Sequence, residues 1–183
     1  MKHPPSHAPN PDAPQPTLSV VIPCYNEVHT VKNVVDRVLK VEVVTEIIIV
    51  DDGSTDGTLD VLKEIEAEGH DNVRVFYHDR NQGKGAALVT GFQHAVCEVI
   101  IIQDADFEYD PREFAKILNP IREGVTPVVY GSRFLGAPRK AMKFWNMIAN
   151  KGLTLLTNVL YNAILSDMET CYKCFRREVV QDM

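Results

Sequence analysis

Two carboxylates that follow an apolar run are the residues of this sequence best suited to chemistry. The run Ile100–Ile102 is β-branched, which is typical of a buried strand, and Asp104 and Asp106 come just after it. Side chains two positions apart in an extended chain point the same way, so we expect both carboxylates on one side of the strand's C-terminal end. Such a pair repels by about 2–3 kcal/mol at an effective dielectric constant near 20. A hard divalent cation turns this repulsion into binding, with bound phosphates completing its coordination, whereas the alternative is a simple acidic turn.

A second pair of carboxylates ends another apolar run. Asp51 and Asp52 follow Val50 and precede the turn residues Gly53 and Ser54. A carboxylate at such a strand end can accept hydrogen bonds from a nucleotide base or from a ribose hydroxyl. The alternative is a capping turn, because Ser54 is a good N-cap residue for the helix expected after it.

The first apolar run ends in groups that suit a nucleoside. It is followed by the residues Pro23–Glu27, where Tyr25 offers an aromatic face for a base. Asn26 and Glu27 offer polar edges beside it. This loop alone predicts a binding function only weakly.

A glycine-rich loop opens one of the expected helices. Asn81–Gly85 reads N-Q-G-K-G, and its backbone N–H groups together with Lys84 can meet a phosphate. The loop lacks the Walker A spacing, and it does not have the strand-linked G-x-G-x-x-G pattern of a dinucleotide-binding fold. A P-loop is therefore disfavoured.

The elements that must position these loops alternate between strands and helices. The short apolar runs that we expect to be strands are 18–22, 46–50, 73–77, 99–103 and 127–130. The amphipathic stretches that we expect to be helices are 30–40, 57–68, 84–96 and 111–122. This order predicts an α/β fold with a doubly wound, mostly parallel sheet and helices on both faces. Ligands of such sheets bind at the carboxyl ends of the strands, so the three polar loops are expected on one rim.

The C-terminal third follows a different pattern. Residues 140–165 are expected to form one long or two shorter helices, within a basic amphipathic segment spanning 139–165. The apolar stripe of this segment consists of Leu155, Leu156, Val159, Leu160, Ala163 and Ile164. Phe144 and Trp145 lie beside basic residues, an arrangement that fits a peripheral membrane contact and equally fits a helix packed on the domain.

Composition bounds the class of protein. The 183 residues suffice for one domain, and the formal net charge of −6 argues against general nucleic-acid binding. Basic residues nevertheless outnumber acidic ones between positions 133 and 177, which suggests a local anionic partner such as a phosphate or a lipid surface. The four cysteines are few and two of them lie in or beside apolar runs, so reduced thiols and a cytoplasmic location are the simplest expectation. Residues 1–16 are proline-rich and are expected to be a disordered tail before a single domain over 17–183.

Taken in order, the motifs resemble the family-2 inverting glycosyltransferases. They read V-V-I-P-C-Y-N-E, I-I-I-V-D-D-G-S-T-D-G-T, N-Q-G-K-G-A-A-L, Q-D-A-D-F-E-Y-D-P, G-S-R-F and D-M-E-T-C-Y-K. The branch that the sequence is most similar to is the polyprenyl-phosphate sugar synthases, which use dolichyl or undecaprenyl phosphate. The resemblance implies a GT-A fold, a Mg²⁺ or Mn²⁺ cofactor and a UDP- or GDP-hexose donor. The chain ends soon after the last motif, whereas members of this branch continue, so C-terminal truncation is one expectation.

The resemblance also assigns residues to roles. The nucleotide-sugar site would comprise Pro23, Tyr25, Asn26, Glu27, Asp52, Gly53, Lys84, Asp104 and Ala105. The metal ligands would be Asp104 and Asp106, with Glu108 as a third oxygen ligand where several relatives have glutamine. The acceptor phosphate would be bound by Arg133, Lys140 and Lys143.

The chemistry then depends on the acceptor. A polyprenyl phosphate is already an anionic nucleophile, so transfer at the cytoplasmic face of a membrane would need no strong base, and direct attack would invert the anomeric carbon. The catalytic residues would be Asp104, Asp106 and Arg133. A sugar or protein hydroxyl would instead need a base, for which Asp167 and Glu169 are the candidates. A non-catalytic nucleotide-sugar-binding domain is the remaining alternative.

Overall fold

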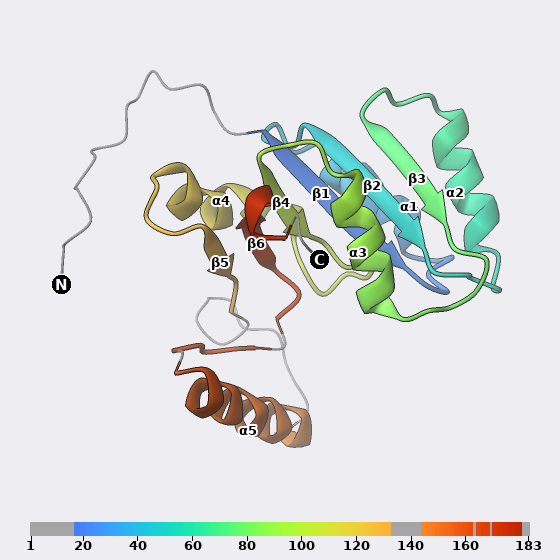
Figure 1. Ribbon diagram of the computed structural model, residues 1–183. Helices are drawn as coiled ribbons and strands as arrows, with labels where there is room; N and C mark the ends of the chain where they lie inside the picture. The colour runs from blue at the N-terminus through green and yellow to red at the C-terminus, as the bar shows by residue number, and fades with distance from the viewer. Residues whose placement is uncertain (1–16, 133–143, 163, 169, 181–183) are drawn as a thin grey trace.

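The computed structural model describes residues 17–132, 144–162, 164–168 and 170–180. The expected proline-rich tail over 1–16 lies outside these residues. The elements, in chain order, are β1 (Leu18–Cys24), α1 (Val31–Val38), β2 (Glu46–Asp51), α2 (Thr58–Ala67), β3 (Val73–Tyr77), α3 (Lys84–His94), β4 (Val99–Ile102), η1 (Pro111–Glu113), α4 (Phe114–Arg122), β5 (Val128–Tyr130), α5 (Phe144–Tyr161), β6 (Lys173–Arg176) and η2 (Arg177–Val179). The strands form one sheet in the order β3-β2-β1-β4-β6-β5 (Figure 1).

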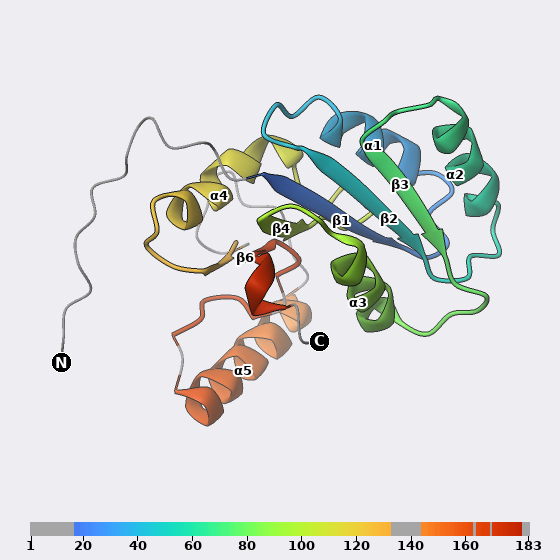
Figure 2. The same ribbon diagram turned by 45° about the horizontal axis from the view of Figure 1, so that its top comes forward.

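The first four strands in this order are parallel, as the sequence predicts. Every residue of β1, β2 and β4 is buried, which explains why these strands are near-continuous apolar runs without alternation. Helices α1 and α2 pack against one face of these strands, and α3 covers the other (Figures 1 and 2). The expected doubly wound arrangement is confirmed for this half of the sheet.

Helix α3 lies unusually close to the strand beneath it. A Cβ atom placed on Gly91 would come within 2.3 Å of Val21 Cγ1, so a side chain at this position would have to displace the Val21 side chain. The close approach brings the N-terminus of α3, with Lys84, to the carboxyl ends of β1 and β4.

The other half of the sheet differs from the prediction. Strand β6 was not predicted, and it pairs antiparallel with both β4 and β5, so the sheet is mixed, although its other five strands run in one direction as a mostly parallel sheet requires. In this register Ile101 lies opposite Cys174, and Tyr130 lies opposite Lys173. Because β6 runs against its neighbours, its first residue rather than its last lies at the rim where β4 and β5 end.

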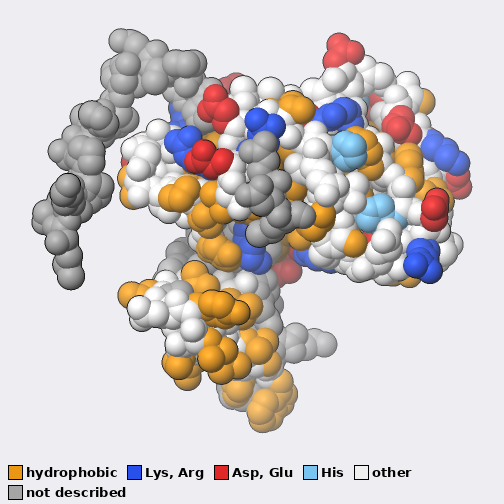
Figure 3. Space-filling view, in the orientation of Figure 1, with side chains coloured by type: hydrophobic (Ala, Val, Ile, Leu, Met, Phe, Trp, Pro, Cys, Tyr) orange, Lys and Arg blue, Asp and Glu red, His pale blue; other side chains and the backbone are white. Residues whose placement is uncertain are grey.

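Helix α5 turns its polar side toward the protein. Asn150 and Thr154 are buried, and Asn158 binds the backbone of Leu165 twice, through Nδ2 to the carbonyl at 2.9 Å and through Oδ1 to the amide at 2.8 Å. The described residues of the expected apolar stripe, which are all its members except Ala163, face outward, with Leu160 68 % exposed. Figure 3 shows these hydrophobic side chains gathered over α5, away from the sheet. Within the described residues, no helix has both the length and the apolar character needed to cross a bilayer.

Candidate active site

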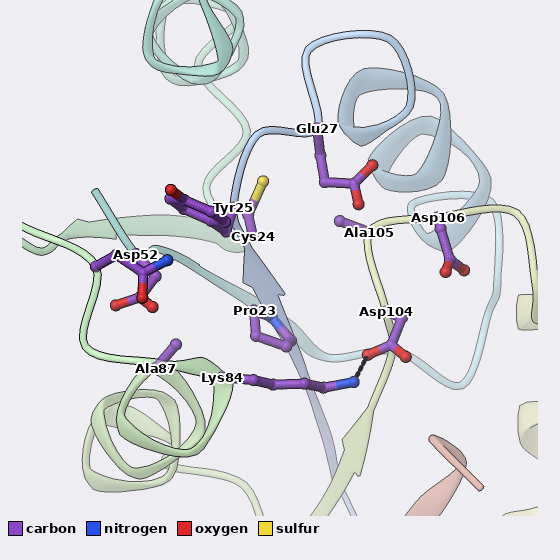
Figure 4. A pocket seen from close by; sticks show the side chains of 11 residues that line it. Pro23, Cys24, Tyr25, Glu27, Asp52, Lys84, Ala87, Asp104, Ala105 and Asp106 are labelled. Carbon is purple, nitrogen blue, oxygen red and sulfur yellow. Dashed lines mark hydrogen bonds and ion pairs between the residues drawn. The ribbon is translucent and has the colours of Figure 1, made fainter. Parts of the chain in front are cut away.

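The three polar loops meet in one cleft at the carboxyl ends of β1, β2 and β4, as topology predicts. The cleft has a volume of about 260 Å³ and opens to solvent (Figure 4). The residues that line it are Pro23, Cys24, Tyr25, Glu27, Asp52, Asn81, Lys84, Ala87, Asp104, Ala105 and Asp106. Seven of the nine residues assigned to the nucleotide-sugar site are in this set, and the other two, Asn26 and Gly53, are not.

The two leading carboxylates lie in a loop rather than in a strand. Strand β4 ends at Ile102, Asp104 follows it in irregular chain, and Asp106 lies in the bend after that. Asp104 Oδ1 accepts a hydrogen bond from Lys84 Nζ at 2.5 Å, and the dashed line in Figure 4 marks this pair. Burial alone would lower the pKa of Lys84, but the charge and hydrogen bond of Asp104 outweigh it and raise that pKa above its ordinary value. The ammonium group therefore occupies the place beside Asp104 that a cation would take.

Glu108 does not complete a three-carboxylate set. Its backbone N–H donates to Asp106 Oδ1 at 2.8 Å, so the loop folds back on Asp106, but the Glu108 side chain does not line the cleft. Among the described residues, no three acidic, histidine or cysteine side chains are grouped closely enough to hold a metal. The geometry thus offers two carboxylates to a cation, and not the three that the sequence suggested.

Asp52 is buried and is tied to the glycine-rich loop. Its carboxylate accepts hydrogen bonds from the backbone N–H groups of Gln82 at 3.0 Å and Gly83 at 2.7 Å, and His78 Nδ1 lies 2.8 Å away. Burial would raise the pKa of Asp52, but these hydrogen bonds dominate and hold it below the usual range. Asp52 therefore fixes the position of the loop that carries Lys84, while its edge still faces the cleft.

Asn26 and Gly53 build the rim without lining it. Asn26 donates its backbone N–H to Ser54 Oγ at 2.9 Å and accepts from the Thr55 N–H at 2.8 Å, which joins the loops after β1 and β2. Gly53 has φ 73°, and a Cβ atom there would come within 2.6 Å of the Arg80 backbone. Both residues hold loops together, which is a different role from the ligand contact that the resemblance implied.

Tyr25 and Glu27 present the groups that a nucleoside requires. Tyr25 is 45 % exposed at the edge of the cleft, so its ring face is accessible. Glu27 is held by its backbone N–H, which donates to Thr58 Oγ1 at 2.8 Å, and its carboxylate accepts from the Thr30 hydroxyl. Figure 4 shows the Glu27 carboxylate directed across the cleft toward the loop of Ala105 and Asp106.

Of the remaining candidate residues, the structure describes only Asp167. Asp167 is only 2 % exposed, accepts from Asn150 Nδ2 at 2.9 Å and does not line the cleft. The other candidates fall outside the described residues: they are Arg133, Lys140, Lys143 and Glu169.

Three lining residues were not among the assigned ones. Asn81 lies in the same glycine-rich loop as Lys84, and Cys24 lies between Pro23 and Tyr25, so both could have been inferred from their neighbours. Ala87 faces the cleft from the first turn of α3 and has no chemical signature that would mark it. All four cysteines of the chain are free and buried, and burial raises the pKa of the Cys24 thiol well above its ordinary value.

Comparison with known proteins decides the family. The profile described as "Glycosyl transferase family 2" matches residues 19–183, which includes every strand and helix described above except the first residue of β1. The chain belongs to glycosyltransferase family 2. The family resemblance inferred from the motifs is thereby confirmed.

The curated relatives of this family-2 chain act on lipid phosphates. A UDP-N-acetylglucosamine–dolichyl-phosphate N-acetylglucosaminyltransferase of Methanococcus voltae is 31% identical over 90% of this chain and 71% of its own length. An undecaprenyl-phosphate 4-deoxy-4-formamido-L-arabinose transferase of Pectobacterium atrosepticum is 30% identical over 91% and 50% respectively. A polyprenol monophosphomannose synthase of Mycolicibacterium smegmatis is 29% identical over 88% and 62%. The chain thus spans only part of the length of these relatives.

Solved structures share the fold. A mannosyltransferase of Pyrobaculum calidifontis in complex with GDP-Man and Mn²⁺ has a TM-score of 0.67 at 24% identity, covering 98% of this chain and 50% of that one. A glucosyl-3-phosphoglycerate synthase of Mycobacterium tuberculosis, with Mn²⁺, UDP and phosphoglyceric acid, has a TM-score of 0.69 at 22% identity, covering 90% and 57%. The family-2 chain therefore has the expected GT-A fold.

The site residues fit a divalent cation. Asp104 and Asp106 supply hard oxygen donors, and the Lys84 ammonium already neutralises one of them as a cation would. Mg²⁺ in enzymes is commonly held by one or two carboxylates, with substrate phosphates and water as the other ligands. Two carboxylates in an open cleft match that pattern without a third protein ligand.

Proposed function

We propose that this chain transfers a hexose from a UDP- or GDP-sugar to a polyprenyl phosphate, with inversion at the anomeric carbon. The observation that carries the proposal is the cleft in which Tyr25 and Glu27 lie across from Asp104, Asp106 and Lys84. One side suits a nucleoside and the other suits a cation-bound diphosphate. The curated relatives, whose names specify dolichyl, undecaprenyl or polyprenol phosphate acceptors, support this choice of acceptor.

Some residues of the cleft would bind the nucleoside, and others would stabilise the negative charge of the diphosphate. Asp104 and Asp106 would hold Mg²⁺ or Mn²⁺, which when bound supplies positive charge to the departing nucleoside diphosphate. Lys84 adds a second positive charge at the N-terminus of α3, where backbone N–H groups also favour an anion. Tyr25 and Glu27 orient the nucleoside end. Because a phosphate acceptor is ionised at neutral pH, these residues need no partner that removes a proton.

The position of Asp167 favours this acceptor over a hydroxyl. A general base must reach the proton that it removes, directly or through one water. Asp167 is buried beneath α5, is engaged by Asn150 and does not line the cleft. Transfer to a sugar or protein hydroxyl therefore remains the second candidate, with Glu169 as the other base suggested by the sequence.

Transfer of radiolabel tests the proposal. The chain is incubated with labelled UDP- and GDP-hexoses, Mg²⁺ or Mn²⁺, and either a polyprenyl phosphate or the matching polyprenol. We expect label in the lipid phase with the phosphate only, and an inverted anomer by NMR of the product. Label with the polyprenol as well would favour a hydroxyl acceptor. Nucleotide binding with no transfer to either lipid would favour the non-catalytic alternative.

We also propose that α5 contacts the membrane surface from which the acceptor is taken. The helix fixes itself to the protein through hydrogen-bonding side chains and leaves its apolar side outward, with Val159 71 % exposed and Trp145 75 % exposed. This polarity is the reverse of a helix that packs on a protein core, and it matches a helix that lies in a bilayer interface. A lipid acceptor at the cytoplasmic face would place such a surface beside α5.

Vesicle sedimentation tests the contact. Val159→Glu places a charge on the outward side of α5. It should lower the affinity of the protein for vesicles of phosphatidylcholine and phosphatidylglycerol about tenfold. Val96→Glu is the matched control, because Val96 is also exposed but lies after α3. Equal sedimentation of the two variants would contradict the proposed contact between α5 and the membrane.

A further inference from the structure

The antiparallel strand β6 brings an unassigned lysine to the rim. Lys173 is the first residue of β6 and pairs with Tyr130, the last residue of β5. The backbone N–H of Gly131 donates to the Tyr172 carbonyl at 2.7 Å, which continues this pairing beyond the strand. Lys173 is therefore fixed beside Tyr130 and Gly131, which directly precede the rest of the G-S-R-F motif in the sequence.

The Lys173 ammonium is half-buried, and none of the described residues supplies a counter-charge in direct contact with it. Its Nζ donates to the Thr170 carbonyl at 2.5 Å and lies 5.6 Å from the centre of the Tyr130 ring. In the described part of the chain, no carboxylate forms an ion pair with it. An ammonium group has three donors, and two of them have no acceptor among the described residues. Burial, the largest cause, lowers the pKa of Lys173, as expected for a cation without a paired anion.

A second polar group beside Lys173 is also unsatisfied. The Thr170 hydroxyl is fully buried and has no hydrogen-bond partner in the part of the chain that the structure describes. Buried polar groups without a partner are rare and carry a free-energy cost. The same residue supplies the carbonyl that fixes Lys173, so the unsatisfied hydroxyl and the unpaired ammonium belong to one short segment.

Lys84 cannot substitute for this pair of groups. Its ammonium is held by Asp104 and lines the donor cleft, whereas Lys173 does not line that cleft. The charge of Lys84 lowers the pKa of Lys173, and the charge of Asp104 raises it. Lys173 is therefore close enough to the donor cleft to interact electrostatically with both groups. One cation thus lies on the donor side, and the other lies toward β5.

We propose that Lys173 and Thr170 form the binding position for the phosphate monoester of the acceptor. This inference rests on the proposed function, and it names residues on β6 and the loop before it that sequence reasoning did not assign. A phosphate offers several acceptor oxygens, which would take the two free donors of Lys173 and the Thr170 hydroxyl. Negative charge at this place would also compensate the desolvated ammonium.

A binding experiment separates this inference from the proposed activity. The chain, loaded with Mg²⁺ and UDP or GDP, is titrated calorimetrically with geranyl phosphate, geraniol and inorganic phosphate. We expect geranyl phosphate to bind the wild-type chain and to lose about tenfold or more in affinity with Lys173→Met, but only about threefold with Lys173→Arg. Lys116→Met, an exposed lysine of α4, is the control and should bind as the wild type does.

Thr170→Val adds a readout that a structural role would not give. Removing a buried hydroxyl that has no partner should leave the melting temperature unchanged or raise it. Geranyl phosphate affinity should nevertheless fall about threefold or more. A loss of stability without a loss of affinity would make the residue structural and would overturn its assignment.

The remaining outcomes are distinct. Geranyl phosphate binding that is equal in wild type and Lys173→Met overturns the inference and leaves the proposed function intact. An equal loss of nucleotide affinity in Lys173→Met moves the lysine to the donor diphosphate and also overturns it. Inorganic phosphate binding as tightly as geranyl phosphate would identify a free-anion site rather than a lipid headgroup site. A wild-type chain that binds nucleotide but no phosphate compound would contradict the proposed function as well.

Discussion

Lys84 Nζ and Asp104 Oδ1 lie 2.5 Å apart across the candidate cleft, in the position where a divalent cation would be expected. One carboxylate cannot hold both partners equally well, because the cation and the ammonium repel each other. A nucleoside diphosphate resolves this competition, since its oxygens can accept the ammonium while Asp104 turns to the metal. Cation and nucleotide should therefore bind with mutual dependence.

Lys84→Met tests this competition. We expect the affinity for Mn²⁺ alone to rise about two- to fivefold, because a half-exposed ion pair contributes up to about 1 kcal/mol. The affinity for UDP or GDP in the presence of Mn²⁺ should instead fall about tenfold. Calorimetry with each ligand separately measures both, and Lys63→Met on the exposed side of α2 serves as control. A fall in the affinities for both Mn²⁺ and the nucleotide would contradict competition between Lys84 and the cation for Asp104.

Asp106→Asn should remove the metal dependence of nucleotide binding. The loss of one of two carboxylates should lower nucleotide affinity in Mn²⁺ by about tenfold or more, while the affinity measured with a chelator stays the same. Glu108→Gln is the matched comparison and should have little effect, since the Glu108 side chain does not line the cleft. A loss with Glu108→Gln as large as with Asp106→Asn would restore the three-carboxylate site.

Asp110 predicts a defined loss of stability in acid. Its hydrogen bonds to Arg112, together with the charges of Arg112 and Arg37, lower the pKa of Asp110 to about 2 despite partial burial. Because the folded-state pKa lies below the ordinary value, the stabilisation is complete above about pH 4 and is lost as the pH falls toward 2. Asp110 also caps the helical turn of η1 by accepting from the Arg112 N–H at 3.1 Å.

Urea unfolding of wild type and Asp110→Asn measures this contribution. The difference in unfolding free energy should be under about 1 kcal/mol near pH 6, since the pair is partly solvated, and should shrink as the pH approaches 2. A difference that grows on acidification would have the wrong sign and would refute the assignment.

Gly53→Ala should destabilise the rim more than a left-handed backbone alone requires. Gly53 and Gly69 both have positive φ, of 73° and 70°, but only Gly53 has backbone atoms in the place of a Cβ atom. Alanine should cost about 1 kcal/mol at Gly69 and about 2–4 kcal/mol at Gly53. Urea unfolding compares the two variants. Equal costs would mean that the loops after β2 and β3 are not in close contact.

Much of the sheet and cleft was predictable because buried parallel strands leave a strong sequence signal. The apolar runs of β1, β2 and β4 predict buried strands, and the topology then places the loops that follow them on one rim. Tyr25, Asp52 and Asp104 were assigned to the cleft on this basis, and the structure brings them together. Whether each contacts a nucleotide stays a prediction.

The features that were missed have weak or ambiguous signals. β6 has four residues, begins and ends with basic side chains, and is too short for a periodic pattern. The rule for carboxyl ends also covers parallel strands only, so Lys173 was indicated only by the general excess of basic residues between 133 and 177. Glu108 follows Asp106 by two positions, but in a bend this spacing does not fix direction. For α5 the pattern gave the correct apolar stripe, yet amphipathicity does not say which side meets the protein.

The hydrogen bonds beneath α5 have a mechanical consequence. Asn158 forms hydrogen bonds with the backbone of Leu165, and the Thr154 hydroxyl accepts one from the backbone N–H of Met168. Both backbone positions shortly precede Thr170 and β6 in the sequence. A displacement of the helix would therefore also shift Leu165 and Met168, which precede β6 by a few residues in the sequence. Contact of α5 with a surface would then also change the position of Thr170 and Lys173 relative to an incoming headgroup.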